Sequence, residues 1–204
     1  MDVALVLVVV VAAGVVATLT RGESRGFAEL QLRAKSLVVA AVAVQVAGAA
    51  LADHTGHGWC YSVGLATSAA CALGFCLANL RVAGIPLVAA GLVLNALVVA
   101  RNGAMPVSIV AAHRAGVSIL SIATGNDPRH TIAGIGSVWR SLGDVIPVPF
   151  PVAPEVVSPG DVLVAAGLAE FIVMTSRRRR DADQPAGGDT FHASHALSTM
   201  ARRS

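Results

Sequence analysis

The carboxylates of Asp144 and Asp161 are the side chains in this sequence best suited to catalysis. Two carboxylates that share one site do not both ionise easily, so such a pair can act as acid and base in an aspartic dyad. Asp161 also follows Ser158 by three residues, the spacing of a helix capping box, with Pro159 at the first helical position. The sequence leaves both interpretations open: a catalytic dyad, or a structural helix start at Ser158.

Three other polar side chains lie inside apolar runs: Gln45, Asn95 and Glu170. Gln45 and Asn95 are expected to seek hydrogen-bond partners on another helix. Glu170 is the carboxylate that lies deepest in an apolar run, and an ionisable group inside a membrane is a functional candidate by default, for example as a proton-coupling site. The plainer interpretation is that all three side chains stabilise helix packing.

Cysteine and histidine spacing predicts neither a metal site nor a cofactor. Cys60, Cys71 and Cys76 fall in one apolar run without a Cys-x-x-Cys spacing, so we interpret them as small core residues. The histidines match no zinc signature, and the sequence has no glycine motif for phosphate or dinucleotide binding. We therefore expect the chain to work without a cofactor.

The composition predicts that these residues are held by membrane-spanning helices. Of the 204 residues, 55% are hydrophobic and 13% are charged, whereas soluble domains have about 25% charged residues. Basic residues lie between the apolar runs and form no stripe with aromatic side chains, which argues against nucleic-acid binding. Uncharged runs cover residues 3–20, 36–52, 58–80 and 82–100, each close to the roughly 20 residues that cross a bilayer. A shorter run at 161–176 ends at four consecutive arginines.

We therefore predict an all-α membrane protein with about five transmembrane helices. Four helices are expected in residues 1–100, an irregular extracytoplasmic segment in 101–160, the fifth helix in 161–176, and a disordered basic tail in 177–204. Eleven of the 15 Lys and Arg residues then share one side, which the positive-inside rule assigns to the cytoplasm. The N-terminus is outside and the C-terminus is cytoplasmic. An excess of Arg over Lys beside many Ala, Val and Gly favours a bacterial source and its inner membrane.

Within the outer segment, the sequence predicts an amphipathic helix from Val107 to Leu120. Arg114, Ser118 and Ser121 are spaced four and three residues apart and would share one helix face. A membrane crossing here would place Arg114 near the bilayer centre, at a cost of about 2.5 to 3.5 kcal/mol. We therefore expect the helix to lie on the outer membrane surface with its apolar face at the headgroup boundary.

Three short motifs punctuate the outer segment: Asn102, Gly103, Met105 and Pro106; then Gly143, Asp144 and Pro147; then Ser158, Pro159, Gly160 and Asp161. With an amphipathic helix between the first two motifs and apolar runs on either side, the chain resembles the uncharacterised bacterial membrane proteins of domain-of-unknown-function family 5317. The resemblance extends in layout over roughly residues 1–176. It implies a multi-pass inner-membrane protein with an ordered outer segment, and it implies no particular activity.

The resulting functional hypothesis is a non-catalytic component of the envelope or of a membrane complex. Its partners would be the lipid bilayer and either another membrane protein or a second copy of the chain. Two alternatives belong to other classes. One is an intramembrane aspartic-type enzyme that uses Asp144 and Asp161. The other is a small transporter that uses Gln45, Asn95 and Glu170, although the sequence has no internal repeat of the kind common in transporters.

Overall fold

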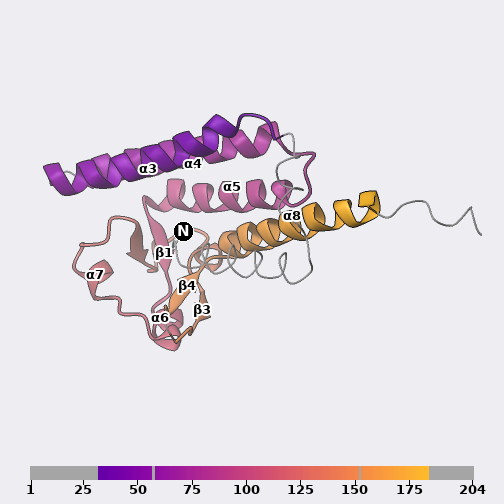
Figure 1. Cartoon of the computed structure of the whole chain (residues 1–204). Coiled ribbons are helices and arrows are strands. Elements are labelled where there is room, and N and C mark those ends of the chain that lie inside the picture. The colour runs from indigo at the N-terminus through magenta and orange to yellow at the C-terminus, as the bar shows by residue number, and fades with distance from the viewer. Residues whose placement is uncertain (1–31, 57, 152, 184–204) are drawn as a thin grey trace, which may run out of the picture.

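The computed structural model describes residues 32–56, 58–151 and 153–183. The predicted first span at 3–20 and the part of the predicted tail from residue 184 onward lie outside the described residues. The described chain is mostly helical. It consists of four long helices and a smaller segment of short strands and helices inserted between the last two of them (Figure 1).

The long helices are α3 (Lys35–Thr55), α4 (Gly58–Ala78), α5 (Ile85–Asn102) and α8 (Pro159–Asp183). Helices α3 and α4 form an antiparallel pair, and α5 lies between this pair and α8 (Figure 1). The stretches Lys35–Ala52, Trp59–Ala78 and Ile85–Asn102 are long and apolar enough to cross a membrane. These three match the second, third and fourth runs in the sequence.

Helices α3 and α4 touch through their backbones. Gly48 on α3 lies against Gly64 on α4, and a Cβ on either residue would be 2.9 Å from the Cα of the other. The opposite face of α3 is apolar and uncovered among the described residues: Val39 is 70% exposed, Val42 61% and Val46 62%. This pair is therefore packed by small residues on the inside and presents large aliphatic side chains on the outside, as membrane helices do.

Helices α5 and α8 also approach through glycines. Gly84 lies against Gly167 and Gly91 lies against Gly160, so the two helices run antiparallel with contacts one heptad apart. A Cβ at Gly167 would be 2.5 Å from the carbonyl oxygen of Gly84, and a Cβ at Gly91 would collide with the carbonyl oxygen of Gly160. Only glycine allows the helix backbones to come this close.

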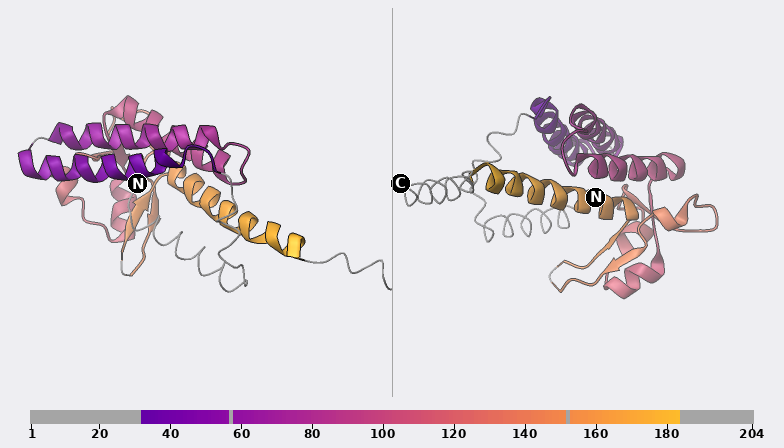
Figure 2. Two further views of the ribbon diagram at one scale, coloured as in Figure 1. Left: turned by 45° about the horizontal axis from the view of Figure 1, so that its top comes forward. Right: turned by 90° about the vertical axis from the view of Figure 1, so that its right-hand side faces the viewer.

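The segment between α5 and α8 is more ordered than the sequence predicted. Strand β1 (Met105–Val107) pairs in parallel with β2 (His130–Ile132), and β3 (Ile146–Val148) pairs antiparallel with β4 (Glu155–Val157). The prediction of an all-α chain with an irregular outer segment was wrong in this respect. Three-residue strands are too short to produce an alternating pattern that sequence reading detects. The β3–β4 hairpin projects from the rest of this segment (Figure 2).

The predicted surface helix at 107–120 is also wrong in extent. The structure has α6 (Ile109–Ala115), α7 (Leu120–Ala123) and, later, the short helix η1 (Arg140–Leu142). Ser108 caps the start of α6 through its side chain, and Gly116 ends it in the left-handed region at φ +79°. Gly116 ends the helix because glycine adopts this left-handed conformation at little cost and a right-handed α-helix cannot continue through it.

Helix α8 is longer at its C-terminal end than the predicted fifth span. It starts at Pro159, two residues before the predicted run, and continues to Asp183 through the four arginines. Residues 177–183 of the predicted disordered tail are therefore helical. A run of arginines favours helix, which explains why the charge boundary is not the helix boundary.

The glycine contacts between α5 and α8 make a direct prediction. The substitution Gly167→Ala should lower the free energy of unfolding by about 1–3 kcal/mol, because the added methyl group would overlap backbone atoms of α5. This loss should appear even though alanine is the better helix former. Thermal unfolding of the purified chain in detergent measures the effect.

The matched control is Gly136→Ala. Nothing lies within 4 Å of a Cβ at Gly136, so this variant should unfold at the temperature of the unmodified protein. Equal stability of the Gly167 and Gly136 variants would contradict close packing of α5 against α8.

Candidate functional site

The buried polar cluster of the molecule forms where α8 begins beside α5. The Ser158 backbone N–H donates to Asp161 Oδ2 at 3.0 Å, and the Asp161 N–H donates to Ser158 Oγ at 3.0 Å. These reciprocal bonds are the capping box that the spacing of the two residues predicted. Ser158 has no exposed surface and Asp161 is 6% exposed.

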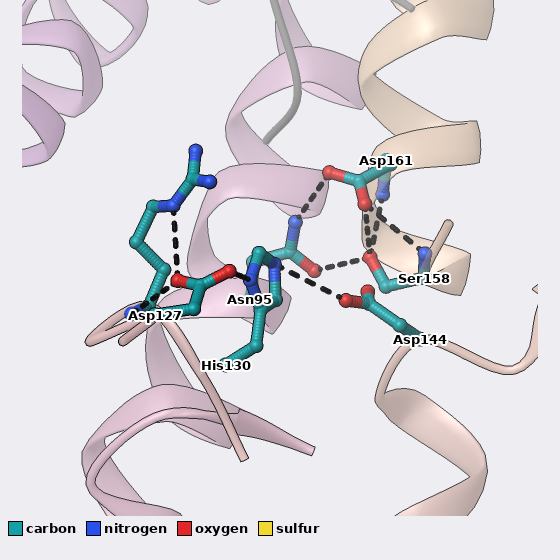
Figure 3. Close-up of polar contacts among 7 residues, drawn as sticks. Asn95, Asp127, His130, Asp144, Ser158 and Asp161 are labelled. Atoms are coloured by element: carbon teal, nitrogen blue, oxygen red, sulfur yellow. Dashed lines mark hydrogen bonds and ion pairs between the residues drawn. The ribbon is translucent and has the colours of Figure 1, made fainter. Parts of the chain in front are cut away.

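Asn95 joins this cap from the neighbouring helix (Figure 3). Its amide Nδ2 donates to Asp161 Oδ1 at 2.8 Å, and its Oδ1 lies 2.8 Å from Ser158 Oγ. Ser158 Oγ is also 2.8 Å from Asp161 Oδ2, so one hydroxyl proton faces two acceptors. Asn95 therefore does have a partner on another helix, as expected for an amide in an apolar run.

The glycine between the two capping residues makes this contact possible. A Cβ at Gly160 would collide with Oδ1 of Asn95 and lie 2.9 Å from the carbonyl oxygen of Gly91. The third sequence motif is thus explained residue by residue: Ser158 and Asp161 form the cap, Pro159 starts the helix, and Gly160 leaves room for the amide of Asn95.

A second polar group lies in the outer segment, where His130 stands between two carboxylates (Figure 3). Its Nδ1 is 2.8 Å from Asp127 Oδ2, and its Nε2 is 3.6 Å from Asp144 Oδ2. All three side chains are largely buried, with exposures of 12%, 13% and 6% for His130, Asp127 and Asp144. Sequence reading missed this arrangement, because Asp127 and Asp144 are 17 positions apart and only the fold brings them to one imidazole.

The electrostatics of Asp127 favour its ionised form. Partial burial raises the pKa of Asp127, but this effect is outweighed by the hydrogen bond with the His130 side chain, the hydrogen bond from the Arg129 backbone, and the charges of both residues. The net result is a pKa below the ordinary value of 3.8. The Arg129 guanidinium approaches the same carboxylate at 3.3 Å.

Strand β1 positions Asp144 and connects the first two sequence motifs. The Asp144 N–H donates to the carbonyl of Pro106, and the Asp144 carbonyl accepts from the Ser108 N–H, both at 2.9 Å. A Cβ at Gly143 would collide with the Pro106 carbonyl oxygen, so glycine is required next to Asp144. Met105, like the rest of β1, is buried.

Asn102, the first residue of the first motif, ties the outer segment to α5. Its Nδ2 donates to the carbonyls of Val98 and Val138, and its Oδ1 accepts from the Val138 N–H at 2.8 Å. Gly103 ends α5 in the left-handed region at φ +80°. The residue after Val138, Trp139, holds the left-handed conformation at φ +53°, which is unusual for a bulky side chain and stands next to this clamp.

The remaining sequence candidates lie away from these two groups. Gln45 is half-buried on α3, and Pro147 lies opposite Val156 in the β3–β4 ladder. Glu170 directly precedes Phe171, whose backbone faces Gly84 just before α5 begins. Glu170 is therefore level with the N-terminal end of α5, whereas Asn95 lies toward its other end.

An asparagine that the sequence analysis did not single out performs a similar structural task. Asn79 follows α4, is 4% exposed, and clamps the backbone of Arg33. Its Oδ1 accepts from the Arg33 N–H at 2.8 Å, and its Nδ2 donates to the Arg33 carbonyl at 2.9 Å. Asn79 and Asn102 thus each bind the backbone of a distant segment at the end of a long helix.

The model of one protein family, described as a family of unknown function (DUF5317), matches residues 29–173, which is more than half of the chain. The chain belongs to this family. The match spans all three motifs of this DUF5317 protein and both polar groups. No curated protein and no solved structure matches the chain.

The DUF5317 cap offers limited chemistry. Both oxygens of Asp161 accept hydrogen bonds from Asn95 and from Ser158, so this carboxylate is occupied by structural partners. Asp144 approaches His130 instead, and the close-up shows the two carboxylates on different elements (Figure 3). Within residues 32–56, 58–151 and 153–183, no group of three His, Cys, Asp or Glu side chains could hold a metal ion.

The shared cap predicts energetic coupling between α5 and α8. In a double-mutant cycle, Asn95→Ala and Asp161→Ala should interact by about 0.5–3 kcal/mol, because each substitution removes the partner of the other. Chemical denaturation in detergent of the two single variants and the double variant measures this term.

A control cycle pairs Asp161→Ala with Asn102→Ala. Asn102 bonds to Val98 and Val138 and shares no recorded partner with Asp161, so these effects should add to within about 0.5 kcal/mol. Additivity in the Asn95 cycle as well would show that the cap bonds do not link the helices.

Proposed function

We propose that this DUF5317 protein is a multi-pass protein of the bacterial inner membrane and serves there as a non-catalytic component that docks a membrane-protein partner or a second copy through its outer segment. The observation that carries this proposal is the apolar surface of long helices that the other described residues leave uncovered. Residues such as Val39, Val42 and Val46 are more than half exposed on a helix that is long enough to cross a bilayer. In water such a surface would drive aggregation, whereas lipid chains solvate it.

The distribution of basic residues supports a cytoplasmic C-terminus and a five-span arrangement. Helix α3 begins, α4 ends and α5 begins at one end of the helical layer, close to Arg33, Lys35 and Arg81. Because α8 runs antiparallel to α5, its arginine-rich C-terminal part extends to the same end. Basic residues on one side of a helical layer are typical of the cytoplasmic side of a membrane.

A docking role fits the outer segment because it combines an ordered interior with exposed apolar side chains. Ala111, Ala112 and Ala115 of α6 pack inward, whereas Val110 is 61% exposed and Leu120 on α7 is 68% exposed. The interior packs Val107 of β1 and Val156 of β4 against α6, so the exposed side chains stand on a packed support. Exposed apolar patches of this kind mark protein interaction sites.

The aspartic-type enzyme remains a second candidate, because Asp144 and Asp161 are both buried carboxylates, 5% and 6% exposed. The contacts favour the structural role: Asp161 is held by Ser158 and Asn95, and an aspartic dyad needs two carboxylates that share one site. The transporter alternative needs Glu170 and Asn95 to act together. It is weakened because Glu170 is level with the N-terminal end of α5, whereas Asn95 lies toward the other end.

The proposed topology predicts a labelling pattern in intact cells. In a chain with its native cysteines replaced by alanine, a cysteine at exposed Asn126 should react with a membrane-impermeant maleimide from outside. A cysteine at Leu80, which is 44% exposed and lies just after the C-terminal end of α4, should react only after the membrane is permeabilised. The reverse pattern would contradict the orientation, and labelling of both sites in intact cells would contradict the membrane crossing.

The docking role predicts a partner that depends on the α6 surface. Affinity purification from detergent-solubilised membranes should recover a stoichiometric partner or a second copy, and Val110→Arg should abolish the recovery because a charge would be placed in an apolar contact. Asn126→Arg changes an exposed residue of the same segment and is the matched control. Recovery that is unaffected by Val110→Arg would contradict the docking surface.

The enzyme alternative has a separate test. Loss of a cellular phenotype in Asp144→Asn and Asp161→Asn at normal protein level would favour the enzyme.

A further inference from the structure

The tip of the β3–β4 hairpin is an exposed arm without polar side chains. The described residues 146–151 and 153–154 comprise only proline, isoleucine, valine, phenylalanine and alanine. Phe150, which lies in the turn beyond the Val148–Glu155 pair, is 49% exposed although its side chain is large and apolar. The tip therefore presents apolar surface that the described chain does not cover.

The backbone of this tip is equally poor in free hydrogen-bond donors. Pro147, Pro149, Pro151 and Pro154 have no N–H group. The N–H of Phe150 donates to the carbonyl of Val148 at 2.8 Å, so it is satisfied within the tip itself. Backbone N–H and C=O groups that enter hydrocarbon need partners within the protein. The four prolines and the Phe150 bond reduce the number of N–H groups that would need one.

The hairpin is placed beside the apolar helices. Strand β4 leads through Ser158 directly into α8, so the base of the hairpin is attached where α8 begins. In the right-hand view of Figure 2, the hairpin diverges from α8, and its tip points toward the side on which α8 ends. Glu155, opposite Val148 in the ladder, marks the point at which the apolar tip gives way to a charged residue.

We propose that the tip of the β3–β4 hairpin inserts into the outer leaflet of the lipid bilayer, where Phe150 contacts acyl chains and anchors the outer segment to the membrane surface. This inference rests on the membrane-spanning arrangement proposed above. Lipid is the occupant that the chemistry favours, because the tip offers no side-chain hydrogen bond with which to orient a protein, whereas protein interfaces carry regularly spaced hydrogen bonds. Apolar side chains at the headgroup boundary need only burial.

The test measures the depth of three labelled positions in the full chain. Single cysteines at Phe150, Val42 and Asn126, with Cys60, Cys71 and Cys76 replaced by alanine, carry an environment-sensitive fluorophore. Each protein is reconstituted into vesicles of phosphatidylcholine with a minor share of phosphatidylglycerol. Quenching is measured with iodide in the buffer and with a phospholipid that carries a nitroxide near the top of its acyl chain.

We expect the label at Phe150 to lose most of its emission to the nitroxide lipid and to resist iodide. The label at Val42, on the uncovered face of α3, reports on the membrane crossing alone and should be quenched by nitroxide lipid whatever the hairpin does. The label at Asn126 is the matched outer-segment control and should respond to iodide.

Each other outcome has a distinct meaning. Nitroxide quenching at Val42 with iodide quenching at Phe150 would overturn the hairpin insertion and leave the membrane arrangement intact. Protection of Phe150 from both quenchers would mean that protein covers the tip, and it would also overturn the proposal. Iodide quenching at Val42 would contradict the membrane arrangement itself, and with it the insertion.

Discussion

The backbone contact between α5 and α8 is the constraint on which the rest of the described structure depends. Gly84 against Gly167 and Gly91 against Gly160 leave no space for side chains between the helices. Because the two helices are so close, the Asn95 amide lies 2.8 Å from Asp161 in the cap of α8. Helices that were held apart by ordinary side chains would break the bonds of Asn95 to Asp161 and Ser158. Asp161 would keep its bonds to Ser158, whereas the partly buried Asn95 amide would lose these two partners, and leaving a buried polar group unsatisfied costs about 1–3 kcal/mol.

The outer segment depends on this contact because it is attached at both of its ends. At one end, Asn102 clamps the loop at Val138 to the last turn of α5. At the other end, β4 leads directly into the cap at Ser158. Between them, β1 is flanked on one side by β2 and on the other by Asp144, so it acts as the hub of the segment. The three motifs of the outer segment are thus largely the residues that fasten this segment to the helices.

Polar and apolar groups are sharply separated in this architecture. Ser158, Asp161 and Asn95 satisfy one another, and no buried side-chain N or O atom among the described residues is left without a hydrogen bond. The outward faces of α3 and α4 and the tip of the β3–β4 hairpin are apolar instead. A protein with a polar junction inside and apolar surfaces outside matches the bilayer as a solvent, in which unpaired polar groups are costly and exposed aliphatic side chains are not.

The long helices and their local start signals could be predicted from the amino-acid sequence. Uncharged runs at 36–52, 58–80 and 82–100 correspond to α3, α4 and α5, because a helix of apolar residues is set by length and composition that are local to the run. The capping box of Ser158 and Asp161 was equally readable, since its two bonds join residues three apart. The three-residue strands were not readable, because such short elements depend on pairing with distant segments. The helix break at Gly116 has a local cause, the glycine itself, which the predicted helix at 107–120 did not take into account.

The partners of the polar residues, in contrast, depend on how distant segments pack together. Asn95 and Asp161 are separated by 66 positions and become partners through two glycine contacts between different helices. His130 contacts Asp127, which precedes it by only three residues. It contacts Asp144 only because strand β1 pairs with β2 on one side and with the backbone of Asp144 on the other. Composition and spacing record the preference of each residue for burial or for a hydrogen bond. The choice of partner depends on which backbones can approach, and that is a property of the packed helices as a whole.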